Sequence, residues 1–254
     1  MIPYFELSNI SLGPLTIHVW GLMVGIGILA GCVASARFAR ARGLNPQVIW
    51  DTTPWIVIGA FVGARLFHVF FYEPAFYFAN PVQILMIWNG GLSISGGLIG
   101  SLIVGVWMLK KKQVNVLHYA EMMVFGLPLG TFIGRLGCFF THMHPGRPTS
   151  FILGVLYPDG IVRHELGLYL SLDGLVLFTI FLLLKKRKLP HGTLIALYLT
   201  WYGTTRFILD FYRATDGMNT DVRYAGLTPA QYLSVALFIA GVYIISRMKK
   251  FSVH

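Results

Sequence analysis

Seven arginines stand apart from the other cations of this 254-residue chain, because they lie outside its short clusters of Lys and Arg. An arginine guanidinium is planar and binds a phosphate or carboxylate through paired hydrogen bonds, whereas lysine presents a point charge. The seven are Arg65, Arg135, Arg147, Arg163, Arg206, Arg213 and Arg223. Their residue type favours binding of an anionic group such as a phosphate.

Arg65, Arg135 and Arg206 lie within or at the ends of long apolar stretches. A charge at the centre of a membrane span costs at least ~2.5–3.5 kcal/mol, so such a residue normally faces a partner or a wet cavity. Internal ion pairs are one solution, since Asp210 follows Arg206 by one helical turn and Glu73 follows Arg65. The chain has only 10 acidic residues, however. The surplus of positive charge therefore also predicts an anionic lipid headgroup as the ligand.

Two histidines form an H-x-H pair, His142 and His144, at the expected outer end of a helix. Such a pair could bind a metal, but no third ligand is evident nearby in the sequence. Hydrogen bonding or proton transfer is the more plausible role, and we expect neither a metal nor a cofactor.

The composition predicts an all-α membrane protein. Hydrophobic residues make up 56% of the chain and charged residues only 12%, against roughly 25% charged residues in soluble domains. At ~20 residues per span, the chain has room for about seven transmembrane helices. The apolar stretches are 18–36, 52–72, 93–109, 118–140, 166–184, 192–212 and 229–246. Residues 76–88 are apolar but short, with Pro81 inside, which favours an interfacial or re-entrant segment.

The positions of the cations predict the orientation of these helices. Thirteen of the 20 Lys and Arg residues lie at 37–42, 110–112, 185–188 and 247–250, which share one side if seven helices span. By the positive-inside rule that side is cytoplasmic, so the N-terminus is outside and the C-terminus cytoplasmic. Residues 1–254 then form a single polytopic membrane domain with periplasmic loops at about 73–92, 141–165 and 213–228.

Two further expectations follow from where the charges lie. The net charge of +10 is distributed in clusters between apolar segments, which argues against binding of nucleic acid. Residues 1–16 have no basic region followed by a short apolar run, so we expect no cleaved signal peptide.

Several motifs occur in a fixed order along almost the whole chain. The strongest is Gly134-Arg135-Leu136-Gly137-Cys138-Phe139, followed by Gly146-Arg147. The others lie at residues 17–23, 63–74, 88–93, 163–164, 202–213 with Asp216, and 226–231. Together these motifs resemble the prolipoprotein diacylglyceryl transferase family.

The resemblance implies a multi-pass enzyme of the bacterial inner (plasma) membrane with seven helices and an outside N-terminus. The implied donor is phosphatidylglycerol, and the implied acceptor is the lipobox cysteine of a prolipoprotein signal peptide. The products would be a thioether-linked diacylglyceryl group and glycerol phosphate. Arg135 and Arg206 match the family's two essential arginines, whose expected catalytic role is to bind the phosphate and stabilise its leaving charge. Substrate binding is expected of Arg65, Gly134, Arg147, Ser95, Asp210 and Arg213, and proton acceptance of His142 or His144.

The chain departs from the family pattern at Ser95, which stands where the family usually has a histidine in the form Ser-Phe-His-Gly-Gly. A serine hydroxyl is not a base at neutral pH unaided. Three explanations follow. The protein is a transferase whose proton goes to His142, His144, His68 or water; or it is a divergent paralogue with another acceptor; or it is a non-catalytic phospholipid-binding membrane protein.

Overall fold

The computed structural model describes residues 1–214 and 223–251. Within these residues lie seven long helices, each at one of the predicted apolar stretches. They are α1 (Val19–Ala41), α2 (Gln47–Phe71), α4 (Ile94–Lys111), α5 (Val116–Phe140), α6 (Leu166–Leu184), α7 (Thr193–Leu209) and α8 (Pro229–Phe251). Part of the predicted loop at 213–228, with Asp216 of the motif, lies outside the described residues.

The helices confirm an all-α membrane protein. Six of those described, all except α7, are both long and apolar enough to cross a membrane. Helix α7 has 17 residues and is extended by the short helix η3 (Asp210–Tyr212). That all seven helices span, with the N-terminus outside, stays a prediction.

The chain divides into two compact units. Unit 1 contains Met1–Phe38 and the chain from Ala120 onward, and unit 2 contains Ala39–Tyr119. In unit 1 the helices approach closely at glycines: a Cβ atom on Gly126 of α5 would lie 2.0 Å from the carbonyl oxygen of Gly31 on α1. Likewise, a Cβ atom on Gly203 of α7 would lie 2.7 Å from the carbonyl oxygen of Ser234 on α8. Close approach at small residues is the usual packing of helices in lipid.

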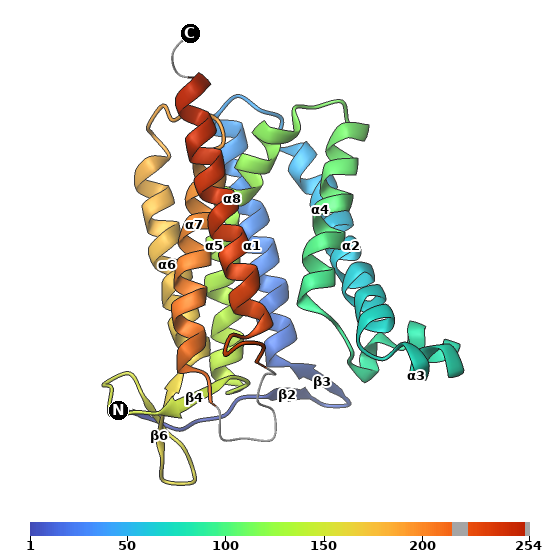
Figure 1. The fold of residues 1–254 in the computed structure, drawn as a ribbon, viewed down its shortest axis with the longest axis vertical. Helices are drawn as coiled ribbons and strands as arrows, with labels where there is room; N and C mark the ends of the chain where they lie inside the picture. Colours follow the sequence, from blue (N-terminus) through green and yellow to red (C-terminus); the bar gives the residue numbers. More distant parts are fainter. Residues whose placement is uncertain (215–222, 252–254) are drawn as a thin grey trace. The chain divides into compact units, whose positions relative to one another are not determined.

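Short strands lie at one end of the unit 1 helices (Figure 1). Four strands form a sheet in the order β1 (Ile2–Pro3), β5 (Val155–Leu156), β6 (Val162–Glu165) and β4 (Pro145–Pro148). Strands β2 (Asn9–Leu12) and β3 (Leu15–His18) form an antiparallel hairpin that turns at Gly13, with φ of 61°. The sheet joins the N-terminal segment to the loop between α5 and α6. Strands of two to four residues are too short to give a period-two pattern, so the sequence does not predict them.

Unit 2 is built on the pair α2 and α4, which also meet through glycines. A Cβ atom on Gly63 would lie 2.4 Å from the carbonyl oxygen of Gly96. At one end of the pair, Nζ of Lys112 lies 2.6 Å from Oδ2 of Asp51. At the other end the chain forms α3 (Pro74–Ala79), η1 (Pro81–Leu85) and η2 (Ile87–Asn89) before α4 begins. The apolar residues 76–88 therefore form no spanning helix, as the sequence predicts.

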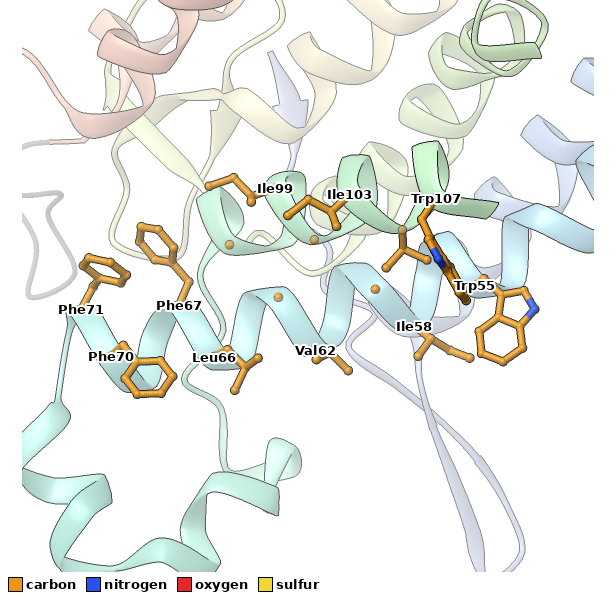
Figure 2. Close-up of a pocket in the computed structure, with 15 residues that line it drawn as sticks. Trp55, Ile58, Val62, Leu66, Phe67, Phe70, Phe71, Ile99, Ile103 and Trp107 are labelled. Carbon is orange, nitrogen blue, oxygen red and sulfur yellow. The ribbon is translucent and has the colours of Figure 1, made fainter. Parts of the chain in front are cut away.

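An apolar groove of about 630 Å³ runs along α2 and α4. Figure 2 shows Trp55 and Trp107 at one end of the groove and Phe67, Phe70 and Phe71 at the other. Glycines of both helices form its floor. Since α2 and α4 are both suited to crossing a membrane, an apolar surface of this kind needs no protein to cover it.

Candidate functional site

Two arginines share one buried carboxylate at the end of α7. Asp210 begins η3 and is fully buried. Its Oδ1 atom lies 3.1 Å from Nη2 of Arg206 and 3.7 Å from Nη1 of Arg213. The four-residue spacing of Arg206 and Asp210 places both on one helix face. The internal ion pair that the sequence suggests for Arg206 is thus formed, but Arg206 shares the Asp210 carboxylate with Arg213.

The N-terminus of α8 fixes this carboxylate. The Thr228 hydroxyl donates to Oδ2 of Asp210 and accepts a hydrogen bond from the backbone N–H of Gln231 at 3.2 Å. The Gln231 side chain accepts in return from the backbone N–H of Thr228 at 3.0 Å. This reciprocal arrangement is a capping box, with Pro229 at the first helical position. The cap of α8 therefore orients the carboxylate on which Arg206 and Arg213 converge.

A third guanidinium comes from Arg135 on α5. The charges of Arg135 and Arg213 both act on the guanidinium of Arg206. Within the described residues, the Arg135 side chain lies 4.0 Å from Sγ of Cys138 and forms no ion pair with a carboxylate. We call Arg135, Arg206 and Arg213 the arginine cluster. Arg206 and Arg213 share the Asp210 carboxylate, and the charge of Arg135 acts on Arg206 beside them. Guanidinium groups gathered in this way are suited to an anionic ligand.

His144 lies beside the arginine cluster, in the loop after α5. Burial, followed by the charges of Arg135, Arg213 and Arg206, lowers the pKa of His144 to about 4. The imidazole is therefore neutral at pH 7 and retains a nitrogen lone pair. Of the two histidines predicted as proton acceptors, His144 is the one that meets the cluster.

The backbone after His144 pairs with the backbone after η3. Gly146 forms an antiparallel bridge with Arg213, and the N–H of Ala214 donates to the carbonyl of Pro145 at 3.4 Å. Nε of Arg147 donates to the carbonyl of Arg213 at 3.3 Å, and the Arg147 side chain is exposed. The pairing brings Arg147 to the edge of the arginine cluster, although 66 residues separate it from Arg213.

His142 is held by hydrogen bonds at both ring nitrogens. Its Nε2–H donates to the carbonyl of Phe5 at 2.6 Å, and Nδ1 lies 2.9 Å from Oε2 of Glu165. The Tyr157 hydroxyl donates to the same Oε2 at 2.7 Å. Burial lowers the pKa of His142, but the hydrogen bond and charge of Glu165 outweigh it, so the net shift is upward. His142 thus fastens the N-terminal segment to the sheet, and in this arrangement no ring nitrogen is available to a ligand.

Comparison with known proteins gives the family. A model of the prolipoprotein diacylglyceryl transferase family matches residues 8–247. A phosphatidylglycerol–prolipoprotein diacylglyceryl transferase of Bordetella parapertussis is 34% identical over 250 residues, covering 95% of each chain. The protein of that name from Francisella tularensis subsp. novicida is 30% identical over 249 residues, covering 96% of this chain and 93% of its own. The chain belongs to the prolipoprotein diacylglyceryl transferase family.

The glycines of the strongest diacylglyceryl transferase motif pack α5 against α1. A Cβ atom on Gly137 would lie 2.8 Å from Cβ of Met23, and one on Gly134 would lie 3.9 Å from the Val24 side chain. Arg135 stands between Gly134 and Gly137 and is thereby held on a helix that is packed closely on one side. The predicted part of Gly134 in binding substrate stays a prediction.

Two residues that the diacylglyceryl transferase motifs single out lie in unit 2. Ser95 is half-buried in the first turn of α4. Arg65 is 4% exposed, and its guanidinium binds backbone carbonyls rather than pairing with Glu73. The predicted substrate-binding roles of Arg65 and Ser95 stay predictions.

The sequence does not predict the contacts of the polar groups that support the site, although the motif at 226–231 contains Thr228 and Gln231. The Thr-Pro-x-Gln pattern at 228–231 was available as a helix-start signal. Asp173 on α6 accepts hydrogen bonds from Nε1 of Trp201 at 2.8 Å and the Thr205 hydroxyl at 3.1 Å, which joins α6 to α7 beside Arg206. That contact has no local signal, because it depends on how two helices pack. Among the residues that the structure describes, no group of three or more His, Cys, Asp or Glu side chains could hold a metal ion.

Proposed function

We propose that this protein transfers the diacylglyceryl group of phosphatidylglycerol to the lipobox cysteine of a prolipoprotein signal peptide. The names of its relatives support the donor and the class of acceptor. The apolar helices support a multi-pass membrane enzyme, which we place in the bacterial inner membrane with the arginine cluster toward the outer face. The single observation that carries the proposal is that Arg206 and Arg213 meet at the Asp210 carboxylate at the end of α7, with the charge of Arg135 acting on Arg206.

The reaction forms one bond and breaks one. The cysteine sulfur attacks a glycerol carbon of the lipid, a C–S bond forms, and the C–O bond to the phosphate breaks. Glycerol phosphate leaves with the electron pair, and the thiol proton passes to a base. Negative charge grows on the phosphate as the bond breaks, and guanidinium groups placed beforehand stabilise that charge most in the transition state. Arg135 and Arg206 take this role.

The remaining cluster residues have supporting roles in the proposal. Arg213 adds a third guanidinium for the phosphate, and Asp210 orients Arg206 and Arg213. Arg147, exposed at the edge of the cluster, contacts the departing headgroup. Gly134 supports substrate binding by its place beside Arg135, where α5 packs against α1.

His144 is the proton acceptor in the proposal. Its imidazole is neutral at pH 7 because burial and the three arginines disfavour its charged form. A phosphate bound in the cluster offsets part of the arginine charge and so raises the proton affinity of His144. The base would then be strongest while the lipid is bound, when the thiol must lose its proton.

A strain depleted of its own diacylglyceryl transferase tests the proposal. Expression of this chain is expected to restore growth and prolipoprotein maturation, while Arg135→Ala and Arg206→Ala are not, at equal amounts in the membrane. Failure of the unaltered chain to mature any prolipoprotein, despite normal membrane insertion, would exclude the lipobox cysteine as its acceptor.

The serine at position 95 keeps a second candidate function open, a paralogue that uses another acceptor or binds phospholipid without catalysis. Ser95→His restores the family's residue type at the start of α4. If the rate of transfer is limited by the lack of the family's histidine as a base, Ser95→His raises the rate of prolipoprotein maturation. No activity before or after this change would favour the second candidate.

A further inference from the structure

Residues 74–92, which we call the arm, present an apolar surface that unit 2 does not cover. The arm comprises α3, η1 and η2 and the turn before α4. Its exposed large hydrophobic residues are Phe76, Phe78, Val82, Leu85, Ile87, Trp88 and Leu92. Leu85 is 77% exposed and Trp88 75% exposed. A contiguous set of exposed apolar side chains marks contact with another apolar phase.

Connectivity sets the depth of the arm in a membrane. The pair of Lys112 with Asp51 lies at one end of α2 and α4, and the arm leaves α2 at the other end. Helix α2 has 25 residues, and at 1.5 Å per residue that is about 37 Å, somewhat more than the ~30 Å of a bilayer's hydrocarbon core. The arm therefore starts at the level of the lipid headgroups. A tryptophan side chain such as that of Trp88 is typical of that layer.

Arg65 fixes the backbone of the arm. A guanidinium has five N–H donors, and those of Arg65 bind five carbonyl oxygens of the arm. The acceptors are Ile84 (2.9 Å), Gly91 (3.0 Å), Met86 (3.1 Å), Gln83 and Gly90. The same guanidinium lies 4.9 Å from the ring centroid of the buried Tyr77. All the donors of Arg65 are thus used within unit 2.

These hydrogen bonds give partners to carbonyl groups that the irregular backbone of the arm would otherwise leave unpaired near a bilayer. Carbonyl groups outside regular helices lack internal partners, and any that turn toward the hydrocarbon find no water to replace them. Gly91 is required for the arrangement, because its φ is 72° and a Cβ atom would lie 2.7 Å from Nη1 of Arg65. Beyond it, the N–H of Ser93 donates to the carbonyl of Ala64 at 3.0 Å, and the Ser93 side chain caps α4.

We propose that the arm inserts its apolar side chains into the interfacial layer of the lipid bilayer, and that Arg65 fixes it there by binding its carbonyl groups. The partner of this surface is lipid rather than protein. Arg65 then acts as a positioning residue for the start of α4, because the backbone it binds leads directly into the first turn of that helix, which contains Ser95.

Spin labels in reconstituted vesicles test the position of the arm. The native Cys32 and Cys138 are both buried, so a nitroxide reagent is directed to one introduced cysteine, and unaltered protein reports any background. We expect labels at Leu85→Cys and Trp88→Cys to collide mainly with oxygen, and a label at Pro158→Cys, in an exposed turn of unit 1, mainly with a water-soluble nickel complex. Equal access of the nickel complex to all three positions would overturn the proposal.

Variants of the arm's anchor test the role of Arg65. Arg65→Lys keeps the positive charge but not the five donors, and Gly91→Ala keeps Arg65 but places a methyl group against it. Both are expected to shorten the rotational correlation time of the label at position 85 at least twofold. Gly97→Ala, whose Cβ atom would lie 3.4 Å from the nearest atom, is the matched control with no effect. Unchanged motion in both test variants would overturn the positioning role.

Discussion

Single residues around the arginine cluster show how a charged site is held in place before its ligand arrives. Asp210 is shared by Arg206 and Arg213, and its second oxygen accepts from Thr228. The carboxylate therefore orients two guanidiniums without cancelling the charge of Arg135. Donors fixed in advance need no reorganisation when charge develops, which is how such groups stabilise a transition state.

His144 predicts how stability depends on pH at this site. Its folded pKa of about 4 lies below the ordinary histidine value of 6.5, so the unfolded chain binds the proton more tightly. The contribution of His144 to stability is then fully present above pH 6.5 and decreases as the pH falls toward 4. We expect the thermal stability of the wild type in detergent to fall more steeply across this range than that of His144→Gln.

His164, whose pKa burial also lowers, contributes equally to both proteins and does not affect this comparison. Parallel pH profiles for the wild type and His144→Gln would contradict the assignment of a neutral imidazole beside the cluster.

Helix α7 is the element that carries the site, and carboxylates anchor it at both ends. Asp210 follows its last turn. At its first turn, Glu121 of α5 is buried and accepts hydrogen bonds from the N–H groups of Gly192 and Leu194, both at 2.9 Å. A carboxylate at a helix N-terminus satisfies free donors and complements the helix dipole. The position of Arg206 therefore also depends on the contact that Glu121 of α5 makes with the other end of α7.

Removing the anchor is expected to destabilise unit 1. Glu121→Ala leaves two buried N–H groups without their acceptor, at a cost of about 1–3 kcal/mol in the free energy of unfolding. Thermal denaturation in detergent measures the effect. Glu6→Ala removes a carboxylate that is solvent-exposed at the N-terminus and should change stability by less than about 0.5 kcal/mol. Equal stability of the two variants would contradict an anchoring role for Glu121.

The helix pair of unit 2 depends on glycine in a different way. Gly63→Ala places a methyl group 2.4 Å from the Gly96 carbonyl oxygen, so α2 and α4 must separate. Overpacking of this kind typically costs about 1–3 kcal/mol. The melting temperature of Gly63→Ala should fall below that of Gly97→Ala, which makes only ordinary contacts. A Gly63→Ala protein as stable as Gly97→Ala would show that the helices adjust freely.

For the molecule as a whole, the sequence predicts the helices well, because an apolar stretch of ~20 residues with few charges indicates a membrane-spanning helix. It also predicts the group of Arg206, Asp210 and Arg213, which are neighbours on one helix end. Residue spacing alone does not predict that Arg135 and His144 join them, since that depends on how α5 and α7 pack. The family resemblance, however, implies that Arg135 and Arg206 bind one phosphate and leaves His142 and His144 as alternative proton acceptors. Nor does the sequence predict that Arg65 binds carbonyl groups, because its partners lie in irregular backbone without a pattern.

The orientation in the membrane is a prediction of the whole chain. Alkaline phosphatase folds and is active only outside the cytoplasm, so fusions to this protein report the side of each loop. A fusion after residue 158 should be active and one after residue 188, within the cluster of four cations at 185–188, should be inactive. The reverse pattern would contradict an outside N-terminus.

The most direct test of the central claim, that the arginine cluster binds the lipid phosphate during transfer, is the mass of a lipobox peptide after incubation with the purified protein in vesicles. With phosphatidylglycerol, we expect a diacylglyceryl thioether and glycerol phosphate, and no product with phosphatidylcholine. Arg135→Ala and Arg206→Ala should lower the rate about 10²- to 10³-fold, whereas Arg247→Ala, which removes a contact with Tyr243 on α8, should not. Unmodified peptide with the wild type, or wild-type rates in both cluster variants, would contradict the account.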